Sequence, residues 1–180
     1  ALATATRRIA IRAGSLVLPL HDPVRVAEDW AVIDSLSGGR AGIAFASGWH
    51  ERDFVLAPHG PHAFARRHET MIEGIGMIQA LWRGEAIALD RGTGAGEVSI
   101  APRPVAGRLP IWLSAAGSDR TFAAAGGLGA GVLTHLLGQT ADDLRRKTGI
   151  FRDAAETTGG PGAVSLMLHT YLADSQDAAR

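Results

Sequence analysis

The sequence has 180 residues, of which 46% are apolar, and its 18 basic and 18 acidic side chains leave no formal net charge. This balance argues against nucleic acid as the main partner, because a phosphate-binding surface normally needs a basic excess. The absence of cysteine excludes a disulfide scaffold, a cysteine-ligated zinc site and a cysteine nucleophile. No stretch approaches the roughly 18 uninterrupted apolar residues of a membrane span, and the first residues lack the apolar core of a signal peptide. We therefore expect a single cytoplasmic domain over residues 1–180 with no membrane partner.

Lysine occurs once, at Lys147, against seventeen arginines, a bias that we attribute to GC-rich codons.

Short apolar segments alternate with helical patterns along the whole chain. The branched aliphatic runs predict five strands, at 8–18, 40–47, 109–114, 130–135 and 163–172. The helical patterns predict helices at 23–37, 63–83, 118–127 and 142–158, the end of a helix at 1–6 and the start of another at 174–180. Between the second and third strands, the segments EAIALD and EVSIAP flank a glycine-rich turn, which is typical of a β-hairpin.

Two of these helices carry clear sequence signals. Asp22 is placed to cap a helix that begins at Pro23 and ends at Gly38, with Val26, Trp30 and Ile33 on one face. In the helix at 63–83, the spacing of four, three and four residues predicts a single buried face, formed by Met71, Ile75, Ile78 and Trp82.

Strands and helices that alternate in this way favour parallel strands joined by right-handed crossovers. Either an open doubly wound sheet or part of a (β/α)8 barrel fits the pattern. Since a full barrel usually needs about 250 residues, we expect an α/β fold that is a partial barrel of about five βα units, apparently a segment of a longer domain. Ligands would then collect at the carboxyl ends of the strands.

The stretch from Ser114 to Ser118 runs from a predicted strand directly into a helix. Its small residues, Ala115, Ala116 and Gly117, let backbone N–H groups approach an anion, and the helix start adds partial positive charge. The stretch is equally consistent with a tight turn in which Ser118 only caps the helix. Neither a GxGxxG motif nor a phosphate-binding lysine accompanies it. Taken alone, it is compatible with an enzyme acting on a phosphorylated metabolite.

A second candidate lies at the end of the second strand. Ala46 and Ser47 leave room for a flat ring, and Gly48 and Trp49 follow. Alternatively, Gly48 only permits a turn and Trp49 fills the rim of the barrel.

Histidines offer candidate acid–base groups. His135 and His169 each end a predicted strand, where either could contact a ligand or transfer a proton. Four more lie together in and after the loop at 48–62, but without helical spacing, so we expect solvated side chains and no metal site; they are His50, His59, His62 and His68.

The block RIAIRAGSLVLPLHDPVRVAEDWAVIDSLSGGRAGIAFASGWHERDF resembles the luciferase-like monooxygenases, which are flavin-dependent TIM-barrel enzymes. The segments LPIWLSAAGSDRTFAAAG and GVLTHLLGQT continue the resemblance, in particular to the subgroup found beside nonribosomal peptide and polyketide synthases. The resemblance implies that further barrel units precede and follow this segment, and that the main catalytic histidine lies outside it.

The resemblance also assigns residues to a flavin. Ala46 and Ser47 correspond to the strand end beside the isoalloxazine ring, with Gly48 in the following turn. The loop that holds the FMN phosphate in relatives corresponds to Ser114, Ala115, Ala116, Gly117 and Ser118. The resemblance places His135 at a strand end that faces the surroundings of the flavin. His135 and, from its position at a predicted strand end, His169 are the candidate catalytic residues.

The implied function is a monooxygenase that uses reduced FMN and O2 to oxygenate a small or carrier-tethered organic substrate. A flavin reductase, synthase modules and a second copy of the chain are the implied partners. One alternative is a hydride-transfer oxidoreductase that depends on the deazaflavin F420. The other is a non-catalytic flavin-binding or interaction module.

Overall fold

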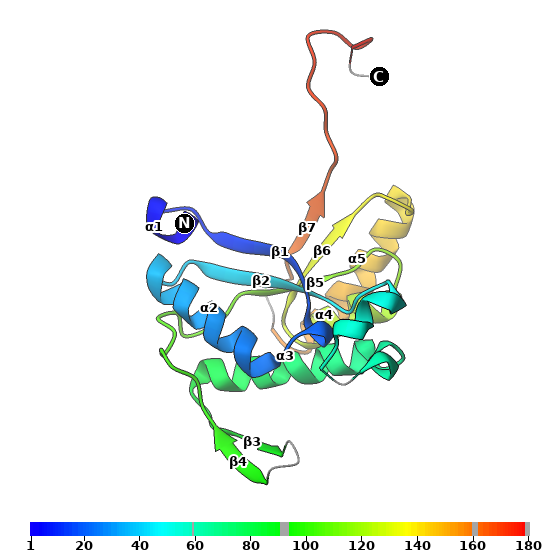
Figure 1. Ribbon diagram of the computed structural model, residues 1–180. Coiled ribbons are helices and arrows are strands. Elements are labelled where there is room, and N and C mark those ends of the chain that lie inside the picture. Colours follow the sequence, from blue (N-terminus) through cyan, green and yellow to red (C-terminus); the bar gives the residue numbers. More distant parts are fainter. Residues whose placement is uncertain (59, 91–93, 160–161, 179–180) are drawn as a thin grey trace. The chain divides into compact units, whose positions relative to one another are not determined.

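The computed structural model describes residues 1–58, 60–90, 94–159 and 162–178. The chain forms two compact units, Ala1–Trp112 and Leu113–Arg180 (Figure 1). The α-helices are α1 (Leu2–Ala5), α2 (Pro23–Ser37), α3 (Arg67–Arg83), α4 (Asp119–Gly127) and α5 (Ala141–Glu156). The strands are β1 (Ile11–Val17), β2 (Ala41–Ala46), β3 (Ile87–Asp90), β4 (Ala95–Val98), β5 (Ile111–Ser114), β6 (Gly131–His135) and β7 (Val164–Met167). Short 3-10 helices are η1 (Leu18–Leu20), η2 (Glu51–Leu56) and η3 (Pro61–Phe64).

Five strands form a sheet in the order β1-β2-β5-β6-β7. The β1–β2 and β6–β7 pairs are parallel, as expected for strands joined by helical crossovers. The predicted α/β architecture with a mostly parallel sheet is therefore confirmed. The predicted hairpin is also present, because β3 and β4 pair antiparallel in a sheet of their own; residues 91–93 of its turn lie outside the described part of the chain.

Helix α2 begins and ends where its sequence signals predict. The Asp22 carboxylate accepts hydrogen bonds from the N–H groups of Val24 (2.9 Å) and Arg25 (3.3 Å). Gly38 ends the helix in the left-handed conformation, at φ 68°, which glycine adopts without a steric penalty. The buried face of this helix differs from the predicted one. Of the three predicted residues, Val26 is buried, whereas Trp30 and Ile33 are half-buried. The buried residues are Val26, Ala27, Ala31, Asp34 and Ser37.

Helix α3 lies beside α2 (Figure 1) and buries the predicted face. Met71, Ile75, Ile78 and Trp82 are at most 4% exposed. The helix begins at Arg67 rather than at residue 63, because η3 occupies Pro61–Phe64. The segment predicted as a loop at 48–62 likewise contains η2.

Asp34 and Arg40 use their polar groups to hold distant segments of the first unit. Fully buried, Asp34 accepts hydrogen bonds through Oδ2 from the N–H groups of Val105 and Ala106, both at 2.8 Å. The Arg40 guanidinium donates to carbonyl oxygens of the N-terminal segment, including those of Thr6 (2.8 Å) and Ile9 (2.6 Å). The motif DSLSGGR therefore links the end of α2 to the loop at residues 105–106 and to the N-terminal segment before β1.

In the second unit, α4 packs against α5. The rings of Phe122 and Phe151, one from each helix, are fully buried. Helix α5 begins with a capping box in which Thr140 and Asp143 exchange hydrogen bonds. Hydrogen bonding from Thr140 lowers the pKa of the Asp143 carboxyl.

The C-terminal end differs from the prediction. Strand β7 ends at Met167, so the strand predicted to reach residue 172 is shorter, and the chain leads away from β7 without regular structure (Figure 1). Tyr171 and Leu172 are 73% and 94% exposed. Residues 174–178 form bends and turns in place of the predicted helix start. Side chains as exposed as these bury too little surface to hold a short segment in a regular conformation.

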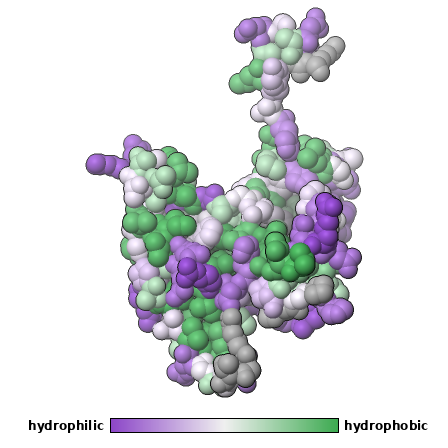
Figure 2. All heavy atoms as spheres, viewed as in Figure 1, coloured by the Kyte–Doolittle hydropathy of each residue, from purple (hydrophilic) through white to green (hydrophobic). Residues whose placement is uncertain are grey.

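Exposed apolar side chains occur in both units, and hydrophobic areas of the surface are visible in green in Figure 2. No helix in the described part of the chain combines the length and the apolar character needed to cross a membrane.

Candidate functional site

The loop predicted to bind an anion follows β5 and leads into α4. The Ala115 N–H donates to the Leu133 carbonyl of β6 at 3.0 Å, so the loop departs directly from the sheet. Ala115 and Ala116 are half-buried and Gly117 is exposed. A Cβ built on Gly117 would meet no atom within 4 Å, so this stretch of backbone is open to a ligand.

Two backbone N–H groups of this loop are available. Ser118 caps α4 as predicted, since its Oγ accepts a hydrogen bond from the Thr121 N–H at 3.3 Å. In the described part of the chain, the N–H groups of Gly117 and Ser118 have no hydrogen-bond acceptor. Free N–H groups at a helix start, together with the helix dipole, suit an anion. The loop therefore has the donors that a phosphate requires.

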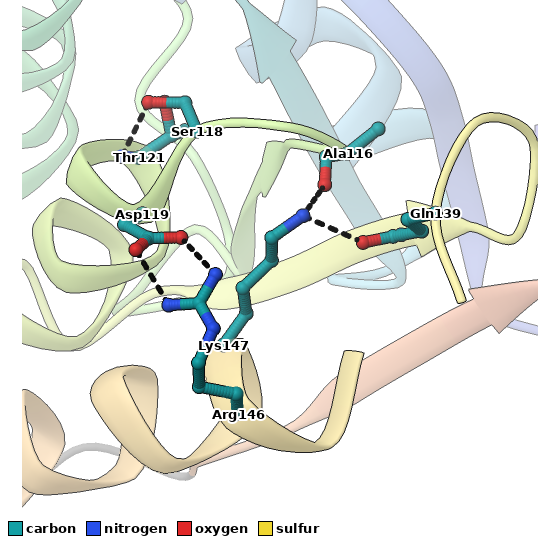
Figure 3. Close-up of polar contacts among 7 residues, drawn as sticks. All are labelled: Ala116, Ser118, Asp119, Thr121, Gln139, Arg146 and Lys147. Carbon is teal, nitrogen blue, oxygen red and sulfur yellow. Dashed lines mark hydrogen bonds and ion pairs between the residues drawn. The ribbon is translucent and has the colours of Figure 1, made fainter. Parts of the chain in front are cut away.

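Behind this loop lies Lys147, a residue of α5 that is only 5% exposed. Its Nζ donates to the Ala116 carbonyl oxygen at 2.7 Å and to Gln139 Oε1 at 3.0 Å (Figure 3). The sequence analysis missed this contact by attributing the single lysine to codon usage. The spacing of Lys147, Phe151 and Ala155 was the available signal, because these three residues form the buried face of α5.

The neighbouring residue, Arg146, contacts the start of α4. Its guanidinium binds both carboxylate oxygens of Asp119, at 2.6 and 3.0 Å (Figure 3). Arg146 lowers the pKa of the Asp119 carboxyl, so this group stays ionised while its charge is balanced. Since Asp119 is in the first turn of α4, an unpaired carboxylate there would repel an anion at the loop.

His135 is the last residue of β6 and is half-buried. Its Nδ1 accepts a hydrogen bond from the Leu137 N–H at 3.1 Å, which places the proton of the neutral ring on Nε2. Gln139 donates to the His135 carbonyl oxygen and, at 2.9 Å, to Thr134 Oγ1. The second candidate, His169, lies two residues beyond β7 and is exposed. Their catalytic roles remain predictions.

The candidate residues for the flavin ring belong to the first unit. Ala46 ends β2, and it and Ser47 are half-buried. Gly48 has φ 88°, and a Cβ there would lie 2.9 Å from the Phe54 ring, so only glycine fits this turn. Trp49 is 84% exposed, and its ring centroid is 4.7 Å from that of His50. The ring-binding role stays a prediction.

Within the described residues, no group of three or more histidine, aspartate or glutamate side chains is arranged to hold a metal ion; His59 lies outside them. A cavity of about 500 Å³ in the first unit is lined by residues of α3, β3 and the segment that leads into α2, among them Asp22, Glu73 and Asp90, and it includes none of the predicted site residues.

Comparison with known proteins adds the family. The sequence profile of the luciferase-like monooxygenases matches residues 1–180. The chain belongs to this family. The subgroup associated with peptide and polyketide synthases is not distinguished by the match.

Individual relatives agree with this assignment. The oxygenase component of the flavin-dependent trigonelline monooxygenase of Acinetobacter baylyi is 27% identical over 99% of this chain and 50% of its own length. A Baeyer–Villiger monooxygenase of Pseudomonas putida, solved with FMN, superposes with a TM-score of 0.79 at 14% identity, over 98% of this chain and 52% of its own. An F420-dependent secondary alcohol dehydrogenase superposes with a TM-score of 0.80 at 17% identity, over 98% and 54%. The chain thus spans about half the length of these relatives, and the two structural similarities establish the fold alone.

Proposed function

We propose that the protein containing this chain is a monooxygenase that takes reduced FMN, and that the loop from Ser114 to Ser118 receives the FMN phosphate. The observation that carries the proposal is the pair of free N–H groups of Gly117 and Ser118 at the start of α4. Small side chains on either side leave this backbone accessible to a phosphate. The resemblance assigns Ala46 and Ser47 to the flavin ring, with Gly48 in the turn that follows.

When bound, reduced FMN supplies the electrons with which O2 is activated and an organic substrate is oxygenated. The part of this chain is to bind and orient the cofactor. The free N–H groups would hold the phosphate, and the Arg146–Asp119 pair keeps a carboxylate charge balanced at the same helix start. His135, with its Nε2 proton available, would donate a hydrogen bond near the flavin. His169 is the second candidate for a polar contact.

The partners follow from the same proposal. The trigonelline enzyme is named as an oxygenase component, which supports a separate flavin reductase as the source of reduced FMN. The resemblance to the subgroup beside peptide and polyketide synthases supports a substrate tethered to a carrier, with synthase modules as neighbours, and a homodimer.

F420 is the second candidate cofactor, favoured by the similarity to the F420-dependent alcohol dehydrogenase. In that case the protein would transfer a hydride to or from its substrate. Oxygen uptake with reduced FMN supports the monooxygenase, whereas reduction of oxidised F420 by a substrate supports the alternative.

A charge placed on the loop tests the phosphate site. Because a side chain on Gly117 has open space, Gly117→Asp adds a carboxylate without a clash, and the repulsion should weaken FMN binding by about 30-fold. Gly117→Asn is the matched control, since it has nearly the same size and no charge. Titration by flavin fluorescence measures both affinities, and equal affinities for the two variants would contradict the assignment.

A further inference from the structure

The buried ammonium group of Lys147 has an unusual setting. Both of its acceptors, the Ala116 carbonyl and the Gln139 amide oxygen, are uncharged. No carboxylate in the described part of the chain lies within ion-pair distance of it, and the carboxylates of Asp119 and Asp143 interact with it only at longer range. A buried charge is costly unless an opposite charge compensates it. The protein thus retains a buried cation beside a loop that has free N–H donors.

The contact with Ala116 also sets the direction of a neighbouring group. The Ala116 carbonyl and the Gly117 N–H belong to the same peptide unit, and in a trans peptide these two groups point in opposite directions. This peptide is trans, since the cis bond found in the described residues is at Ala101–Pro102. Because Lys147 binds the carbonyl from the buried side, the Gly117 N–H points away from Lys147, towards the exposed side of the loop.

We propose that Lys147 is the positioning residue of the phosphate loop: it fixes the Ala116–Gly117 peptide so that the Gly117 N–H faces the phosphate, and its positive charge behind the loop adds a longer-range attraction. This inference rests on the proposed function and extends it to a residue of α5. Lys147 acts through the Ala116–Gly117 peptide and through its charge.

Gln139 completes the arrangement. Its amide oxygen accepts from Lys147, while its amide nitrogen donates to Thr134 Oγ1 and to the His135 carbonyl oxygen at the end of β6. The end of β6 and the loop after β5 are thereby joined through one lysine. Because the Gln139 amide is uncharged, it does not neutralise the Lys147 ammonium group, whereas a carboxylate at this position would neutralise it.

The test compares FMN with riboflavin, which lacks the phosphate. In the Lys147→Met variant of the full chain, the affinity for FMN should fall on the order of 10-fold or more, while the affinity for riboflavin stays the same. A role confined to folding would lower both affinities together. Fluorescence titration of the two flavins gives the ratio directly.

Gln139→Glu is the second variant, and it keeps Lys147 and the size of its partner. The new carboxylate should neutralise the ammonium and also weaken FMN binding without affecting riboflavin. Arg145→Met is the matched control, because it removes a positive charge from an exposed side chain of the same helix, one that pairs with Asp142. We expect its flavin affinities to equal those of the wild type.

The outcomes separate this inference from the proposed function. If wild-type protein does not prefer FMN over riboflavin, the loop binds no phosphate and the proposed function fails with it. If the wild type prefers FMN and either folded variant, Lys147→Met or Gln139→Glu, keeps the full preference, the proposed function stands and the role of Lys147 is wrong.

Discussion

Replacing Gly126 by alanine should destabilise the second unit by about 3 kcal/mol, the upper part of the usual range for overpacking a core. Gly126 lies where α4 crosses α5. An added Cβ would come closer than 3.0 Å to the Phe151 carbonyl oxygen and would lie 2.8 Å from both Ala154 Cβ and the Ala155 nitrogen. Backbone atoms of a helix cannot move aside as the end of a flexible side chain can. The two helices would have to separate, which exposes Phe122 and Phe151.

The adjacent glycine provides the control. Gly127 is in the same helix, but a Cβ there meets no atom within 4 Å. Gly127→Ala should leave the stability unchanged or raise it by up to about 1 kcal/mol, because alanine favours the helix. Urea denaturation of both variants measures the difference in free energy of unfolding. If the two substitutions have the same effect, the close α4–α5 contact is incorrect.

Removal of the Asp34 carboxylate should cost the first unit about 3 kcal/mol. In Asp34→Ala, the part-buried N–H groups of Val105 and Ala106 lose a charged acceptor, and a hydrogen bond to a charged group contributes about 1.5–3 kcal/mol. Asp34→Asn keeps an oxygen that accepts from both, so its cost should be about 1 kcal/mol. Denaturation curves of the two variants report the costs. Hydrogen exchange at Val105 and Ala106 should be faster in the alanine variant alone.

A stable Asp34→Ala protein with unchanged exchange at Val105 and Ala106 would contradict this role. The unpartnered second oxygen of Asp34, Oδ1, is a buried polar atom with no hydrogen bond among the described residues. The expected cost of Asp34→Ala therefore refers to the two hydrogen bonds that Oδ2 accepts.

Local signals in the sequence predicted local structure well. Asp22, Pro23 and Gly38 marked the ends of α2, and the spacing of Met71, Ile75, Ile78 and Trp82 marked the buried face of α3. Each signal acts within a few residues, through a cap, a left-handed turn or a helical period. No partner from another part of the chain is needed to interpret them.

The features that sequence analysis missed depend on distant partners. Asp34 binds N–H groups 71 and 72 residues away, and Lys147 binds a carbonyl 31 residues away. Backbone carbonyls and N–H groups leave no mark in a sequence, so an acidic or basic residue that binds them resembles any solvated charge. The strand predicted to reach residue 172 failed for a related reason, because an apolar run forms a strand only where it can pair.

The loop from Ser114 to Ser118 depends both on local sequence signals and on a contact with a distant residue. Its position after a strand and before a helix, and the capping role of Ser118, could be predicted from residue types alone. The direction of the Gly117 N–H could not, because the carbonyl of the same peptide binds Lys147, a residue of α5 that lies 31 positions away in the sequence. Family membership supports a flavin or deazaflavin enzyme, and the loop is the part of this chain that we assign to the cofactor phosphate.

Amide hydrogen exchange at Gly117 and Ser118 tests the central claim most directly. With reduced FMN under anaerobic conditions, exchange of these two amides in the full chain should slow markedly, because the phosphate becomes their acceptor. Riboflavin should not slow it. If FMN binds and both amides exchange as fast as before, the phosphate lies elsewhere and our account of this site is wrong.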